Sequence, residues 1–166
     1  KKVSKADVLS IFAGLRPLAA PKDKSEKTKE ISRSHKIIVS NSELITITGG
    51  KWTTYRRIAQ DTINKAISIG KLHNVSCKTK KVKIHGATES SDKTHHQYIY
   101  GSDLEGLQNL IKESPELGET LHARLPFTRA EIIWAIRYEM ARTVEDILAR
   151  RVRTLFLDAR ATLEII

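Results

Sequence analysis

The sequence predicts an α+β fragment in which a β-hairpin and a helix are followed by an all-helical C-terminal domain. Residues 35–39, which end in Ile-Ile-Val, and an alternating apolar run at 44–47 are separated by the polar residues 40–43, which predicts a hairpin. Two glycines, Gly49 and Gly50, follow the second strand and allow a tight turn. Helical periodicity then begins, and it returns in the last part of the chain.

The helix after the glycine pair has one apolar face. The residues at helical spacing on that face are Tyr55, Ile58, Ala59, Thr62, Ile63, Ala66 and Ile67. Thr53 and Thr54 are suited to cap its start, and Gly70 to cap its end. Because the first amides of a helix lack intrahelical partners, this turn predicts a site for an anion or an electron-rich ring edge. Lys51 favours the anion, although the same arrangement also occurs in proteins without a ligand there.

Composition divides the chain into three parts. We expect residues 1–70 to belong to one domain, residues 71–97 to form a polar connector, and residues 98–166 to form a helical domain. Thr128 and Glu131 form the pattern of a capping box at the start of one helix of that last domain.

Several residues are expected to have structural roles. Residues 8–13 predict a further strand. The spacing of Asp146 and Arg150 predicts a surface ion pair on a helix. Trp134 and Tyr138 share a helical face, so we expect them to pack against neighbours rather than bind a cofactor.

The formal net charge of +10 is unevenly distributed. Residues 1–70 contain 14 Lys or Arg and 6 Asp or Glu, and residues 71–102 contain 6 and 2. Residues 103–166 contain 9 Lys or Arg and 11 Asp or Glu. A phosphorylated small molecule or an anionic membrane surface fits this charge, while the few aromatic residues disfavour nucleic acid. The single cysteine, Cys77, cannot form an internal disulfide, and no histidine spacing predicts a metal site. The absence of a long apolar run predicts a soluble protein.

Three cations stand beside the predicted turns. Arg16 precedes Pro17, which biases its backbone toward an extended conformation, and Arg33 stands where the hairpin begins. If Arg16, Arg33 and Lys51 converge, an anion must neutralise them. From the residues alone, a structural salt bridge remains the alternative role for Arg16.

Five motifs together resemble the C-terminal part of the FAD-dependent glycerol-3-phosphate dehydrogenases. They are Phe-Ala-Gly-Leu-Arg-Pro-Leu at 12–18, Ser-Arg-Ser-His at 32–35, Thr-Gly-Gly-Lys-Trp-Thr-Thr-Tyr-Arg at 48–56, Leu-Pro-Phe-Thr at 125–128, and the helical stretch at 139–151. The resemblance implies that residues 1–70 are the later half of a split FAD and substrate-binding domain. It also implies that the residues holding the cofactor are Gly49, Gly50, Lys51, Trp52, Thr53 and Thr54.

By the same resemblance, Arg16, Arg33 and Lys51 bind glycerol 3-phosphate for hydride transfer to FAD. The electrons then pass to a quinone. His35 is the candidate base within this chain, but we expect the base to lie upstream. No Gly-x-Gly-x-x-Gly is present, so we expect the isolated fragment to be inactive.

The parent protein is expected in the cytoplasm, bound peripherally to the inner face of the cell membrane. Three alternatives stay open: an oxidase that passes electrons to oxygen, a non-enzymatic basic binding module, and a homo-oligomerisation domain in residues 98–166.

Overall fold

The computed structural model describes residues 2–15, 34–89 and 93–166. The chain forms two compact units, which we describe separately. The first, here called the C-terminal unit, comprises residues 1–13 and 83–166, and the second, the hairpin–helix unit, comprises residues 14–82. The domain limits expected from the sequence stay predictions. The α+β class is confirmed, because both units combine helices with a two-stranded sheet.

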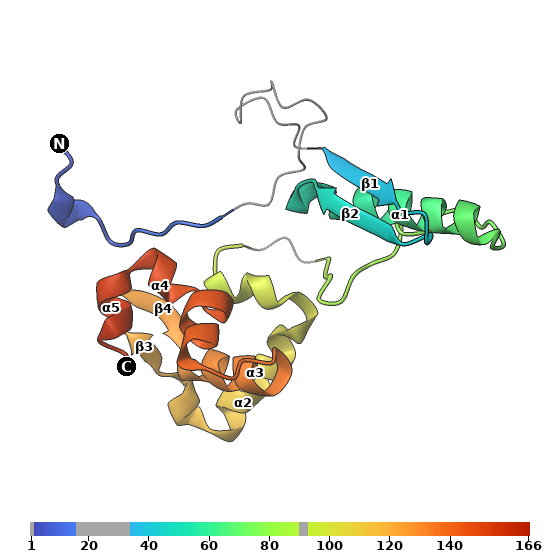
Figure 1. Ribbon diagram of the computed structural model, residues 1–166. Coiled ribbons are helices and arrows are strands. Elements are labelled where there is room, and N and C mark those ends of the chain that lie inside the picture. The colour runs from blue at the N-terminus through green and yellow to red at the C-terminus, as the bar shows by residue number, and fades with distance from the viewer. Residues whose placement is uncertain (1, 16–33, 90–92) are drawn as a thin grey trace. The chain divides into compact units, whose positions relative to one another are not determined.

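The hairpin–helix unit contains the predicted β-hairpin (Figure 1). Strand β1, His35–Val39, pairs antiparallel with β2, Ile45–Gly49, and Ile37 lies opposite Ile47. Glu43 takes a left-handed conformation, with φ of 62°, in the turn between them. The hairpin prediction is therefore confirmed, with its register set by paired apolar residues.

The predicted helix is also confirmed. A 3-10 turn, Trp52–Thr54, leads into α1, Tyr55–Gly70. The prediction that Gly70 caps this helix is wrong, because Gly70 is its last helical residue and Lys71 takes the left-handed position, with φ of 50°. The amides of Lys71 and Leu72 both donate to the carbonyl of Ile67, which satisfies the end of the helix.

The hairpin–helix unit buries none of its described residues from 34 to 82. The apolar face of α1 is only partly covered, and Ile63 remains 58% exposed. On the hairpin, Ile38 and Ile47 are exposed as well. Among the described residues of this unit, local pairing rather than a hydrophobic core therefore supplies the contacts.

The C-terminal unit contains helices, 3-10 and π turns, and a second hairpin. Its described helices and strands are α2 Leu104–Glu113, β3 Thr120–His122, β4 Leu125–Thr128, α3 Arg129–Tyr138, α4 Thr154–Leu157 and α5 Ala159–Leu163. A long 3-10 segment, His96–Asp103, precedes α2, and a π-helical turn, Asp146–Arg151, precedes α4. No helix in the described ranges is long and apolar enough to cross a membrane.

The prediction of an all-helical C-terminal domain is wrong, because β3 and β4 pair antiparallel. Leu125 and Phe127 are buried while Pro126 between them is exposed, which is the alternation of a strand with one face on a core. The strand is short and contains a proline, and helical periodicity flanks it on both sides. The sequence pattern therefore did not predict a strand there.

Two apolar clusters form the core of this unit. The first joins β4 to the C-terminal turns and consists of Leu125, Phe127, Leu148, Val152 and Ala161. The second joins α2 to α3 and consists of Leu107, Leu110, Ala130 and Trp134. The packing role expected for Trp134 and Tyr138 is confirmed, since their ring centroids lie 4.3 Å apart and Trp134 is only 8% exposed.

Residues 8–13 form no strand pair with any described residue, so the strand predicted there is wrong. The segment instead contacts the end of the chain within the same unit. The carbonyl of Leu9 accepts from the amide of Ala159 at 2.9 Å, and Phe12 packs edge-on against Phe156 at 5.0 Å. A strand needs a neighbouring strand, and here a single amide at the start of α5 bonds the backbone of the segment.

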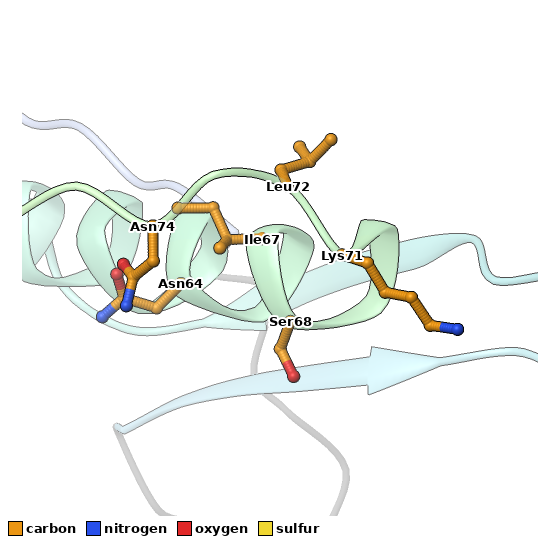
Figure 2. Close-up of a pocket in the computed structure, with 6 residues that line it drawn as sticks. All are labelled: Asn64, Ile67, Ser68, Lys71, Leu72 and Asn74. Atoms are coloured by element: carbon orange, nitrogen blue, oxygen red, sulfur yellow. The ribbon is translucent and has the colours of Figure 1, made fainter.

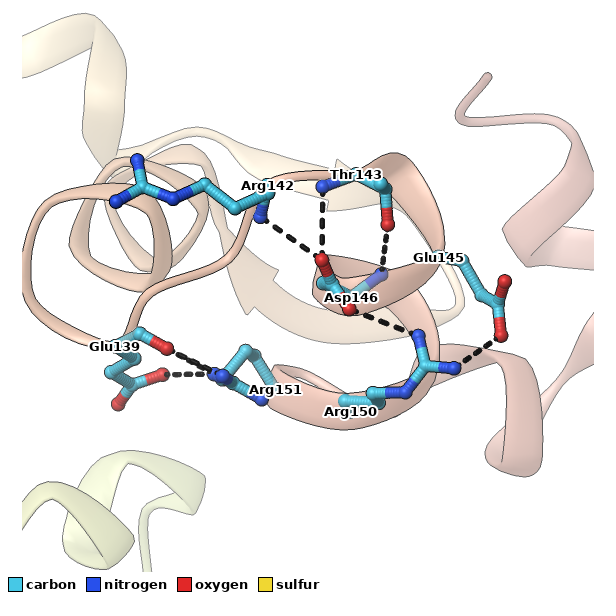
Figure 3. Close-up of polar contacts among 7 residues, drawn as sticks. All are labelled: Glu139, Arg142, Thr143, Glu145, Asp146, Arg150 and Arg151. Atoms are coloured by element: carbon cyan, nitrogen blue, oxygen red, sulfur yellow. Dashed lines mark hydrogen bonds and ion pairs between the residues drawn. The ribbon is translucent and has the colours of Figure 1, made fainter.

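Local polar contacts fix the turn between α3 and the π-helical segment (Figure 3). The carboxylate of Asp146 accepts from the amides of Arg142 and Thr143, each at 3.0 Å. The predicted ion pair is confirmed, because Arg150 donates to Asp146 at 3.0 Å and also to Glu145. The capping box predicted from Thr128 and Glu131 at the start of α3 is confirmed as well.

Candidate functional site

The loop between β2 and α1 requires its two glycines. Gly49 and Gly50 have φ of 77° and 84°, a conformation that costs other residues free energy. A Cβ on Gly50 would lie 2.6 Å from Cδ1 of Ile58 and 3.3 Å from Cβ of His35. Glycine therefore allows the chain to turn from the hairpin into α1 at close range.

Two amides at the start of α1 are open. No hydrogen bond to another described residue uses the amide of Trp52 or Thr53. The amide of Thr54 donates to the carbonyl of Lys51 at 3.0 Å, and the Thr54 hydroxyl accepts from the Lys51 amide at 3.3 Å. Of the three amides assigned to the cofactor, those of Trp52 and Thr53 thus have no acceptor among the described residues, and Thr54 stabilises the turn.

The side chains around this loop are exposed. Trp52 is 86% exposed and stacks on Tyr55, with ring centroids 5.5 Å apart. Lys51 is exposed too, and no carboxylate in the described residues lies within ion-pair distance of its ammonium group. Within the part of the chain that the structure describes, the loop therefore presents one cation without an ion-pair partner beside two backbone donors without acceptors, which is the chemistry of an anion site.

Arg16 and Arg33 lie outside the described residues. Their convergence with Lys51 stays a prediction, as does the assignment of all three to the substrate.

His35, the candidate base within this chain, is engaged by α1. Its Nε2 lies 3.2 Å from the carboxylate of Asp61, which also pairs with Arg57 at 3.1 Å. The Asp61 carboxylate orients the imidazole ring toward the helix. Sequence reasoning missed this group, although Arg57 and Asp61 have the spacing of a helical ion pair.

A second polar group links α1 to the residues after it. Arg56 donates to Gln60 at 2.9 Å and to the hydroxyl of Thr79 at 3.2 Å, and it lies 3.9 Å from Sγ of Cys77. The hydrogen bond with Thr79 and the nearby Arg56 guanidinium lower the pKa of the exposed Cys77 thiol. Sequence patterns give no signal for these contacts, because they depend on the chain folding back along α1.

A pocket of about 560 Å3 lies at the end of α1 (Figure 2). It is lined by Asn64, Ile67, Ser68, Lys71, Leu72 and Asn74. None of the predicted site residues contributes to it. No cluster of metal-ligating side chains occurs in the described ranges.

Comparison with known proteins decides the family. Residues 40–166 match the family described as the C-terminal domain of alpha-glycerophosphate oxidase. This chain belongs to that family. The expected resemblance to the glycerol-3-phosphate dehydrogenases is confirmed by the relatives that match this chain.

Members of the glycerophosphate oxidase and dehydrogenase family match nearly the whole chain. The mitochondrial glycerol-3-phosphate dehydrogenase of Rattus norvegicus is 35% identical over 183 residues, covering 98% of this chain and 25% of its own length. Those of Arabidopsis thaliana and Saccharomyces cerevisiae are each 34% identical, covering 96% and 97% of this chain and 30% and 32% of their own lengths. The chain thus spans a quarter to a third of these relatives, and the matched family region includes both the loop at Gly49 and the helices of the C-terminal unit.

Proposed function

We propose that the protein containing this chain oxidises sn-glycerol 3-phosphate to dihydroxyacetone phosphate, with FAD as hydride acceptor and a quinone as the final electron acceptor. The supporting observation is the turn at Gly49 and Gly50, followed by the amides of Trp52 and Thr53, which have no partner among the described residues, in a chain whose relatives are named glycerol-3-phosphate dehydrogenases. Because this chain spans only part of those relatives, the activity belongs to the longer protein, and we propose that this chain alone is inactive.

The residues of the loop fit a flavin. Glycines at 49 and 50 allow a flat ring to approach the backbone, and the amides of Trp52 and Thr53 are free to donate to an electron-rich edge. FAD, when bound, supplies the hydride acceptor. The positive end of α1 stabilises negative charge on the bound ring, as an oxyanion hole does.

The proposed role of the cations is to orient the substrate. The Lys51 ammonium donates to oxygens of glycerol 3-phosphate, and Arg16 and Arg33 hold its phosphate in two-pronged contacts. Such contacts place the reacting carbon without taking part in bond breaking. Nε2 of His35 already lies 3.2 Å from the carboxylate of Asp61 on α1. We therefore propose that the base lies upstream.

Replacing Lys51 by Ala in the full-length protein tests this assignment. Loss of one charge-assisted hydrogen bond is expected to lower kcat/KM for glycerol 3-phosphate by about 10- to 150-fold, with flavin content unchanged. Lys65→Ala, an exposed lysine on α1, is the matched control and should leave kcat/KM unchanged. Equal kinetics for both variants would show that Lys51 is not a substrate contact.

An oxidase is the second candidate, because the matched family is described by an oxidase. The substrate site would be the same, and only the electron acceptor would differ. Rapid-mixing measurements of the reduced full-length protein separate the two: faster reoxidation by a quinone analogue supports the dehydrogenase, and faster reoxidation by oxygen supports the oxidase.

A further inference from the structure

We propose that Asp61 of α1 is a positioning residue for the loop between β2 and α1, and that it acts through His35 of β1. The inference rests on the proposed function, because that loop is the one assigned to the cofactor. It goes beyond the function by giving a role to a carboxylate that the proposed chemistry does not use. The pair holds the hairpin against α1, so that the amides of Trp52 and Thr53 are fixed before charge develops on the ring.

The pair joins the start of the hairpin to the second turn of the helix. Nε2 of His35 lies 3.2 Å from Oδ2 of Asp61. Both side chains are partly shielded from solvent, with exposed fractions of 21% and 25%. Salt and water weaken such a contact less than they weaken an ion pair on the open surface. The contact therefore contributes to holding β1 on α1.

His35 also lies directly against the glycine turn. In the register of the hairpin it is opposite Gly49. A Cβ on Gly50 would lie 3.3 Å from Cβ of His35 and 2.6 Å from Cδ1 of Ile58, which belongs to α1. The turn is therefore in close contact with both β1 and α1. A shift of β1 relative to α1 moves the turn, and with it the two amides that follow.

The charge of Asp61 is held away from the lysine of the loop. Asp61 is the only Asp or Glu from residue 44 to residue 88. Its carboxylate pairs with His35 and with Nε of Arg57 at 3.1 Å, and among the described residues no ion pair joins it to Lys51. A free carboxylate beside the loop would neutralise this lysine and repel an anionic substrate. The pairing therefore keeps the loop positive while it fixes the turn.

Fixed donors suit the chemistry proposed for this loop. Donors that already point at the place where negative charge develops need no reorientation during the reaction, so they stabilise that charge more than mobile donors do. A displacement of about 1 Å is enough to weaken such a contact strongly. Loss of the pair should therefore reduce the stabilisation of the reduced ring.

Positioning and charge predict opposite effects on the flavin reduction potential. If the pair positions the amides, Asp61→Ala lowers the potential, because donors to the reduced ring are displaced. If only the charge of Asp61 acts, the same change raises the potential, because a nearby negative charge disfavours a negatively charged ring. Asp61→Asn removes the charge but keeps an oxygen that accepts from His35, so positioning predicts a potential close to that of the parent protein.

Redox titration of the full-length, flavin-loaded protein tests the proposal. We expect Asp61→Ala and His35→Ala each to lower the ratio of reduced to oxidised flavin about tenfold at a fixed potential, which corresponds to about 30 mV for a two-electron couple. The double variant should be no worse than either single variant, because both remove the same contact. Arg57→Ala is the matched control. Arg57 is the more exposed partner of Asp61, and its loss should change the ratio less than about twofold.

A parent-like potential in Asp61→Ala would overturn the proposal. So would a rise in both Asp61→Ala and Asp61→Asn, because charge alone would then explain the effect. A lower flavin content with an unchanged potential in the remaining flavin-loaded protein would also overturn it, because the pair would then only brace the fold. Failure of the proposed function has a different signature, since the parent protein would hold flavin without oxidising glycerol 3-phosphate.

Hydrogen exchange in the 166-residue chain tests the positioning without flavin. The Lys51 amide donates to the Thr54 hydroxyl, and the Thr54 amide donates to the Lys51 carbonyl. We expect these two amides to exchange about tenfold faster in Asp61→Ala and at the parent rate in Asp61→Asn. Equal protection in Asp61→Ala and the parent chain would overturn the proposal, whether or not the full-length protein binds flavin.

Discussion

Both units combine a two-stranded antiparallel sheet with helices, but they differ in how they are stabilised. The C-terminal unit buries two apolar clusters and a carboxylate, Glu131, that is completely inaccessible to solvent. The hairpin–helix unit buries none of its described residues between 34 and 82, although it contains the residues assigned to flavin and substrate. In the described part of the site-bearing unit, local hydrogen bonds thus supply the contacts, while the other unit has the core of an independently stable domain.

Each unit has one tryptophan, which makes the comparison measurable. Trp134 is buried in the α2–α3 cluster, whereas Trp52 is exposed at the start of α1. In the variant Trp52→Phe, fluorescence reports on the C-terminal unit alone. Denaturant unfolding followed by this signal gives the free energies discussed below.

The largest effect is expected from Glu131→Ala. The Glu131 carboxylate accepts from the Thr128 amide at 2.7 Å, from the Tyr100 hydroxyl at 3.2 Å, and lies 3.0 Å from Nε2 of His96. Its removal leaves buried donors unsatisfied and should lower the free energy of unfolding by about 3–5 kcal/mol. The exposed pair of Glu119 with Arg129 provides the control, since Glu119→Ala should cost less than about 1 kcal/mol. Similar losses in both variants would contradict a buried network at α3.

Leu107→Ala should follow, with a loss of about 3 kcal/mol, because Leu107 is 0% exposed and its truncation leaves a cavity between α2 and α3. Ile63→Ala is the counterpart in the hairpin–helix unit. Since Ile63 is 58% exposed, this change should alter stability by less than about 0.5 kcal/mol, as measured by amide hydrogen exchange along α1. A large loss at Ile63 would show that the hairpin–helix unit has a core of its own.

Gly50→Ala should destabilise the hairpin–helix unit by about 1–2 kcal/mol, because alanine is strained at φ of 84°. Faster exchange of amides in β2 and the first turn of α1 would report the loss. Gly14→Ala is the control, since a Cβ there meets no atom within 4 Å. Unchanged exchange in the Gly50 variant would mean that the loop can adopt another conformation without cost.

The parts of the fold that depend on neighbouring residues could be predicted from the sequence. The hairpin, α1, the capping box at Thr128 and the Asp146–Arg150 pair each follow from spacing within a few residues. The β3–β4 hairpin was missed because its strands are short and one contains Pro126. The strand predicted at 8–13 failed for a different reason, since strand formation depends on a partner that periodicity cannot supply.

The sequence predicted the backbone turn of the candidate site but not the side-chain contacts around it. Two glycines before a helix indicate the turn and its open amides, and both glycines have positive φ. The contact of His35 with Asp61 joins β1 to α1, and the contact of Arg56 with Thr79 joins α1 to the residues that follow it. These pairings depend on how elements pack, so no pattern within one element reveals them.

The smallest effect, and one that depends on pH, is expected at Asp146 in the C-terminal unit. The pKa of Asp146 lies below its ordinary value. The largest causes are its hydrogen bonds with the Arg142 amide and the Thr143 side chain. A carboxyl whose pKa is lower in the folded state stabilises the protein above its unfolded pKa of about 3.9, and this contribution disappears as the pH falls through the lowered value.

Asp146→Asn should therefore reduce the free energy of unfolding at neutral pH, and the difference from the parent chain should shrink as the pH falls below about 4. Urea unfolding at a series of pH values, followed by Trp134 fluorescence, measures it. In the control Glu145→Gln, only the exposed contact with Arg150 is lost, so its pH dependence should be weaker. If the Asp146 difference stays constant into acid, ionisation of this carboxyl does not contribute to the stability of the turn.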